Sequence, residues 1–160
     1  MTVRLSFRNR QRTRAPDLAQ LRRIVRHLLA TELCARQAEL CFHLVAAPEM
    51  ARVNQKFLGH TGSTDVITFN HADSPQVDSF HGEVFICLDD AVAHAKQFRT
   101  TWQSELVRYV IHALLHLRGY DDRRPAARRK MKREENRLLR RVARDFPLRR
   151  LARSAVSLRP

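Results

Sequence analysis

The sequence predicts an α+β domain, in which a small mixed sheet of about four strands packs against helices and a buried helix lies at the centre. Three observations support this prediction. Short alternating apolar segments, typical of half-buried strands, are interspersed with segments of helical periodicity. The 160 residues have the size of one ordinary domain, and 44% apolar residues are enough to form a core. We therefore expect one domain over residues 1–147 and a basic, loosely held tail over 148–160.

The expected order of elements is β-α-β-α-β-β-α-α-α. Alternating apolar residues predict the first strand at 3–7 and the second at 40–44. Between them an amphipathic helix begins after Asp17, whose side chain is a good N-cap. Proline favours the first turn of a helix, so Pro48 indicates the start of a short helix that continues to residue 57.

Two further strands and a helix are expected in the middle of the chain. β-branched and apolar residues predict strands at 64–70 and 82–88, separated by a polar, exposed loop at 72–80. The Asp89-Asp90 pair is expected to cap a helix over 91–98.

The last two helices differ in character. Residues 104–118 are apolar around most of the helical circumference, which indicates a helix buried on nearly all sides. Gly119 is expected to end this helix, because glycine adopts the left-handed conformation common after a helix C-terminus. A very basic helix is expected over 125–145.

The net charge of +14 is unevenly distributed. Residues 1–36 carry +7, residues 37–116 carry −4 and residues 117–160 carry +11. A neutral-to-acidic middle between two arginine-rich ends is the pattern of a protein that contacts a polyanion, and RNA or DNA is the expected partner. The expected phosphate contacts on the basic helix are Arg128, Arg129, Lys130, Lys132 and Arg133.

Other observations exclude a membrane protein. The longest apolar run, 106–117, is interrupted by Arg108 and two histidines, and residues 1–14 lack the apolar core of a secretory signal. The three cysteines show no Cys-x-x-Cys spacing. Together these features predict a cytoplasmic protein with reduced thiols and no membrane partner.

Two histidines have the spacing of metal ligands. His112 and His116 are four residues apart on the buried helix, so both lie on one face. Gly119 lets the chain reverse, and Asp121 or Asp122 can supply a third ligand. Adjacent side chains point apart, so we expect only one of the two to bind, with Asp122 as the first candidate, and the other to cap or brace the turn. Burying two imidazoles without partners is costly, and one Zn²⁺ or other divalent transition metal per chain would supply the partner.

A metalloprotease of the usual kind is not expected. In those enzymes the two histidines enclose a glutamate that acts as the general base, and that position is Ala113 here.

Three blocks of the chain resemble the YbeY-type endoribonucleases, a family of bacterial rRNA maturation factors. They are Asn-Gln-Lys-Phe at 54–57 with Thr-Asp-Val-Ile-Thr-Phe at 64–69, His-Gly-Glu-Val-Phe-Ile at 81–86, and the histidine segment at 112–122. Met131 and Glu134 or Glu135 fall in the helix that follows, and the resemblance covers about residues 3–145.

The resemblance implies a zinc-dependent endoribonuclease that acts on single-stranded RNA in rRNA processing, with 16S rRNA 3′-end maturation as its task. It implies rRNA and ribosomal particles as partners, His112 and Asp65 as catalytic residues, and His112, His116 and Asp122 as metal ligands. The chain departs from the family pattern twice. Asp122 replaces the third histidine, and Leu58 replaces an arginine associated with RNA handling, for which Lys56 could substitute.

Several roles have alternatives. Asp65 either binds substrate or orients the site, or it braces its loop by backbone hydrogen bonds. Glu83 is either a partner of a ligand histidine or a solvent-facing strand residue. His60, His71 and His81 are expected on the surface.

Two other functions compete with the nuclease. One is a non-catalytic RNA- or ribosome-binding module with a structural metal, and the other is a metal-dependent hydrolase of small molecules. A hydrolase of small molecules would not account for the net charge of +14. An open coordination position would distinguish a catalytic ion, whose water attacks or helps position the phosphodiester, from a structural one. Attack by the RNA 2′-hydroxyl is the other possible route.

Overall fold

The computed structural model describes residues 1–74 and 76–153. Its sheet has the strand order β1-β2-β4-β3. Strands β1, β2 and β4 are parallel, and β3 runs antiparallel to β4. The predicted mixed sheet of four strands is therefore confirmed. The strands are β1 (Thr2–Asn9), β2 (Gln37–Val45), β3 (Val66–Asn70) and β4 (Ser79–Cys87).

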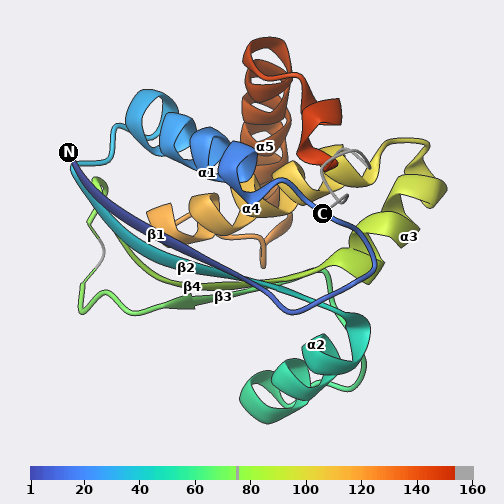
Figure 1. Cartoon of the computed structure of the whole chain (residues 1–160). Coiled ribbons are helices and arrows are strands. Elements are labelled where there is room, and N and C mark those ends of the chain that lie inside the picture. Colours follow the sequence, from blue (N-terminus) through green and yellow to red (C-terminus); the bar gives the residue numbers. More distant parts are fainter. Residues whose placement is uncertain (75, 154–160) are drawn as a thin grey trace.

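Helices cover the two faces of the sheet unequally. One face carries α1, α4 and α5, whereas α2 lies on the other face at one end (Figure 1). The helices are α1 (Leu18–His27), α2 (Ala47–Val53), α3 (Leu88–Phe98), α4 (Trp102–Arg118) and α5 (Pro125–Asp145). Short helical turns extend α1 as η1 (Leu28–Glu32) and α2 as η2 (Asn54–Leu58), and η3 (Leu148–Leu151) follows α5.

The main core lies between the sheet and α4. Phe42 and Ile86 from the sheet and Val110 from α4 are all fully buried. Gly82 on β4 permits the close approach of the Phe69 backbone on β3, because a Cβ at this position would lie 2.3 Å from the Phe69 carbonyl oxygen. As the sequence predicted, α4 is buried around most of its circumference, with Arg108 and its two histidines among the partly exposed residues. The central helix therefore holds its histidines on a rigid support.

Two of the predicted helix caps are confirmed and a third is wrong. Asp17 caps α1 by accepting the Gln20 amide, and Gly119 ends α4 in the left-handed conformation at φ 108°. The prediction that Asp89-Asp90 caps α3 is wrong, because the helix begins at Leu88 with Cys87 as its cap. The two aspartates lie in the first turn, where the helix dipole favours carboxylates.

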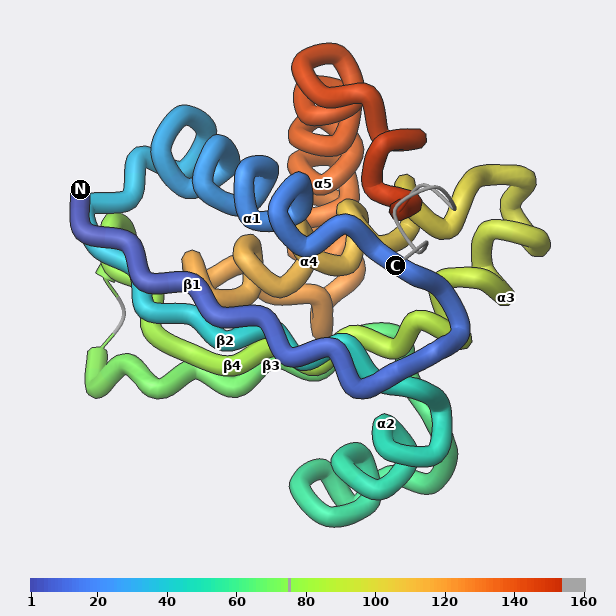
Figure 2. Tube along the Cα trace, in the orientation of Figure 1, coloured from blue at the N-terminus to red at the C-terminus, as the bar shows by residue number. Residues whose placement is uncertain are grey.

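The segment after α5 is more ordered than the composition indicated. We expected a loose tail from residue 148, but Leu151 is fully buried. Its carbonyl accepts the Asp17 amide at 2.7 Å, and the Arg153 amide donates to the Ala15 carbonyl at 2.8 Å. The segment thus returns to the start of α1 (Figure 2). The tail was expected to be loose because it is basic, but an apolar residue within it, Leu151, is buried in the core. Residues 154–160 of the expected tail lie outside the described residues.

Over the described ranges, no helix combines the length and the apolar character needed to cross a bilayer.

Candidate metal centre and adjoining cavity

Three side chains converge where α4 ends. The Nε2 atoms of His112 and His116 lie 3.1 Å apart. Asp122 Oδ2 lies 3.3 Å from His116 Nε2 and 3.7 Å from His112 Nε2. The left-handed Gly119 reverses the chain, so the loop that follows brings Asp122 back to the histidine face. The fold thus brings together the three residues that the sequence predicted as ligands.

The outer hydrogen bonds of the two histidines set their tautomers. His112 Nδ1 lies 2.9 Å from Glu135 Oε2, and His116 Nδ1 lies 3.2 Å from the Tyr120 carbonyl oxygen. Both partners accept, so each Nδ1 carries the proton and each Nε2 presents a lone pair. In this tautomer the two Nε2 atoms and the Asp122 carboxylate oxygen face one another. This donor set fits a divalent cation.

Glu135 on α5 connects this cluster to two cations. Its Oε1 accepts from Arg108 at 2.8 Å and from Lys132 at 3.2 Å, and its side chain is only 5% exposed. Burial opposes ionisation, but hydrogen bonds from His112 and Arg108 outweigh it and lower the pKa of Glu135 to about 2. The carboxylate is therefore ionised and can hold the proton on His112 Nδ1.

Sequence reasoning placed Glu134 or Glu135 in this helix without assigning a role to either. The structure separates them, because Glu134 pairs with Arg137 on its own helix. A signal was present in the sequence. Glu135 is four residues after Met131 and three before Leu138, so it interrupts the apolar stripe of the helix.

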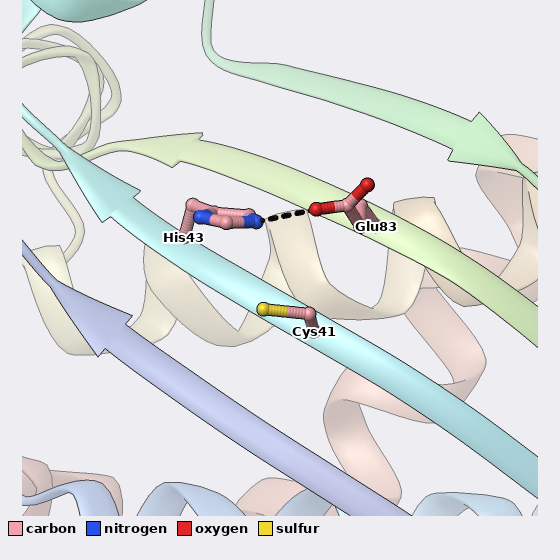
Figure 3. Close-up of side chains that lie close together, drawn as sticks. All are labelled: Cys41, His43 and Glu83. Carbon is pink, nitrogen blue, oxygen red and sulfur yellow. Dashed lines mark hydrogen bonds and ion pairs between the residues drawn. The ribbon is translucent and has the colours of Figure 1, made fainter.

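A second group of possible ligands, Cys41, His43 and Glu83, lies on the other face of the sheet (Figure 3). Cys41 and His43 are two residues apart on β2, so their side chains lie on the same face of the sheet. Glu83 on β4 is in register with Cys41. His43 Nε2 lies 2.9 Å from Glu83 Oε1.

The hydrogen bonds of this second group differ from those of the first. Arg10 Nη1 lies 3.1 Å from His43 Nδ1, and a guanidinium can only donate. His43 therefore carries its proton on Nε2 and donates it to Glu83. His71 Nε2 donates to the other oxygen of Glu83 at 2.9 Å, and the bonds from His71 and His43 lower the Glu83 pKa. The group is a hydrogen-bonded network in which a proton occupies the place that a metal ion would need.

Glu83 consequently has no bond to His112 or His116; its partners are His43 and His71. His60, His71 and His81 are exposed, as the sequence predicted.

A cavity of about 570 Å³ opens beside the His112 cluster. Its walls come from α3, α4, α5 and the start of β3. His112 and Asp122 lie in its wall, so the cavity is continuous with the cluster. Cationic and acidic side chains share the lining, namely Arg108, Arg128, Lys132, Asp65, Glu105 and Glu135.

Both readings of Asp65 have support. Its Oδ1 accepts the Val66 amide at 2.8 Å, so it braces the start of β3, and its carboxylate also lines the cavity. Asp121 accepts the Arg123 amide at 3.0 Å and so braces the turn. Lys56 lies over the Phe57 ring in η2, on the α2 side of the sheet, and does not line the cavity.

The predicted cationic cluster divides over two sides of α5. Arg128 and Lys132 line the cavity. Lys130 and Arg133 line a separate recess with Tyr120, while Arg129 is exposed and lines neither. Only part of the cluster therefore faces the candidate metal centre.

Comparison with known proteins identifies a family. The family model described as Endoribonuclease YbeY matches residues 6–143. Endoribonuclease YbeY of Salinibacter ruber is 34% identical over 141 residues, which cover 84% of this chain and 89% of that protein. Endoribonuclease YbeY of Chlorobium phaeovibrioides is 35% identical, with 88% and 90% covered. The solution structure of TM1509 from Thermotoga maritima has the same fold, with a TM-score of 0.66 and 23% identity over 99% of this chain and 100% of that one.

Proposed function

This chain belongs to the endoribonuclease YbeY family, and on that premise we propose that it is a metal-dependent endoribonuclease that cleaves single-stranded RNA during rRNA processing. One observation carries the metal dependence: His112 Nε2, His116 Nε2 and Asp122 Oδ2 converge within 3.1–3.7 Å of one another. The expected substrates are rRNA and ribosomal particles in the cytoplasm, with the 3′ end of 16S rRNA as the expected target.

In this proposal His112, His116 and Asp122 hold one Zn²⁺ or another divalent transition metal. The bound ion supplies Lewis-acid polarisation of a phosphoryl oxygen. Glu135 holds the proton on His112 Nδ1 and so keeps the other ring nitrogen available as a ligand.

Protein side chains in the cavity provide the remaining functions. Arg128 and Lys132 bind phosphate oxygens, because both are exposed cations in the cavity wall. The Asp65 carboxylate lines the same cavity and accepts a proton from the nucleophile, which is either water or the RNA 2′-hydroxyl. Outside the cavity, the exposed Arg129, Lys130 and Arg133 of α5 extend the contact with the RNA backbone.

The number of ligands favours catalysis over a structural ion. Among the described residues the group has three members, which leaves one position of a tetrahedral ion open. A non-catalytic RNA-binding module with a structural metal would need a fourth protein ligand. The proposed catalytic domain includes the segment that follows α5, because Leu151 is fully buried in the core.

The test combines elemental analysis with an RNA-cleavage assay. The purified protein should contain about one transition metal per chain and cleave a single-stranded oligonucleotide, and a chelator should abolish cleavage. The double substitution His112→Ala with His116→Ala should remove both metal and activity. The matched control is His60→Ala with His81→Ala, because both histidines are exposed and outside the cluster. Full metal content in the His112/His116 variant would refute the ligand assignment.

A further inference from the structure

We propose that the cavity beside the ligand cluster receives one unpaired nucleobase of the RNA, adjacent to the phosphodiester that is cleaved. The proposal rests on the proposed function and adds a subsite for the substrate to it. The cavity volume of about 570 Å³ lies within the range of small-molecule sites, roughly 300–1,000 Å³.

The α3 side of the cavity offers aromatic surface. Phe98, in the last turn of α3, lines the cavity and is 61% exposed, which is unusual for a phenylalanine. His94 stands between it and Tyr109, with edge-to-face packing at centroid distances of 5.9 Å to Phe98 and 6.0 Å to Tyr109. An exposed ring on such a support is a stacking platform, which any base can use.

The interior of the cavity carries carboxylates and one cation, Arg108. Asp65 and Glu105 line it, and Glu105 is 4% exposed and accepts the Thr100 hydroxyl at 2.7 Å. Burial raises the pKa of the Tyr109 hydroxyl, and the neighbouring carboxylates, first Asp65 and then Glu105, raise it further. The N–H groups on a base edge can donate to the Glu105 carboxylate, which lies 4.0 Å from Arg108 Nε.

Cations lie on the opposite side of the cavity. Arg128 and Lys132 on α5 are exposed and line the same space, next to His112 and Asp122 of the cluster. A nucleotide satisfies both sides in the following orientation. Its phosphate lies at α5 beside the cluster, and its base extends across the cavity toward Phe98.

The experiment uses single-stranded RNA oligonucleotides that carry one abasic residue at each position around the mapped cleavage site. The expected result is a fall in kcat/KM of about 5- to 150-fold at one position next to the cleaved bond, the range for loss of one stacked base. Phe98→Ala should cause a similar fall with intact RNA, and the abasic substrate should then cause little further loss. Metal content should not change.

Phe57→Ala is the matched control. Phe57 is 56% exposed, close to the value for Phe98, but it lies in η2 on the α2 side of the sheet (Figure 1). This variant should respond to the abasic residue as the unmodified protein does.

The proposal fails independently of the proposed function. If RNA is cleaved but every abasic position gives the same rate, no base is bound at this site. If one position matters equally in the protein with and without Phe98→Ala, a base is recognised outside this cavity. If no RNA is cleaved, fluorescence anisotropy with chelator present, on single-stranded oligonucleotides that carry one abasic residue at each position in turn, should still show the coupling between base and Phe98, and its absence would overturn the proposal.

Discussion

Removal of the charge on Glu135 tests the link between α5 and the ligand cluster. Glu135→Gln keeps the size of the side chain but replaces a carboxylate that accepts from His112, Arg108 and Lys132. The pKa falls from 4.5 to about 2, and this shift corresponds to about 3 kcal/mol of folding free energy, to order of magnitude. Because the amide can still accept one hydrogen bond, we expect the metal-free variant to lose about 2–3 kcal/mol at neutral pH.

The lowered pKa of Glu135 determines how the stability difference between the two proteins changes with pH. The folded state holds the Glu135 proton less tightly than the unfolded chain, so the stabilisation is complete above a pH of about 4.5. It declines as the pH falls through this value and is lost near pH 2, where the protonated carboxyl resembles the amide. Urea denaturation of the metal-free proteins should therefore show a difference that shrinks between these two values.

Metal affinity provides a second measurement on the same variant. Loss of the partner that orients His112 should weaken binding by about 10- to 100-fold. Glu134→Gln is the matched control, because its carboxylate pairs with Arg137 on the same helix and has no contact with the cluster. It should cost less than about 1 kcal/mol and leave metal affinity unchanged. Equal losses in the two variants, or a difference that does not change with pH, would refute the reasoning.

Three further predictions concern the ligands and the charged surface. Asp122→Ala should weaken metal binding far more than Asp121→Ala in a competition titration, since the latter removes one turn hydrogen bond worth about 1 kcal/mol; Asp122→His should tighten zinc. Cys41→Ser should still leave one metal per chain by elemental analysis, because in the group of Cys41, His43 and Glu83 the proton on His43 Nε2 is donated to Glu83 and no metal is expected there; loss of metal would contradict this. Glutamine at all five cations of α5 should lower RNA affinity and flatten its salt dependence, by a slope of roughly 0.7 per lost phosphate contact, with metal content unchanged; an unaltered slope would mean that this surface does not bind RNA. The five are Arg128, Arg129, Lys130, Lys132 and Arg133.

The sequence by itself determined the features that depend on neighbours along the chain. The spacing of His112 and His116 places both on one helical face, and a glycine three residues later permits the reversal that returns Asp122. The very basic helix predicted over 125–145 is observed as α5 with these bounds. These predictions succeeded because helix geometry and turn chemistry act over a few residues.

Only the tertiary structure decided which contacts form between distant segments. Glu135 reaches His112 across 23 residues, and Arg10 reaches His43 across 33, so the tautomer of neither histidine could be read from local spacing. The cavity exists because α3 and α5 pack on either side of α4. The physical reason is that a ring nitrogen becomes a metal ligand or a proton donor according to the partner of the other nitrogen, and the packing of the fold selects that partner.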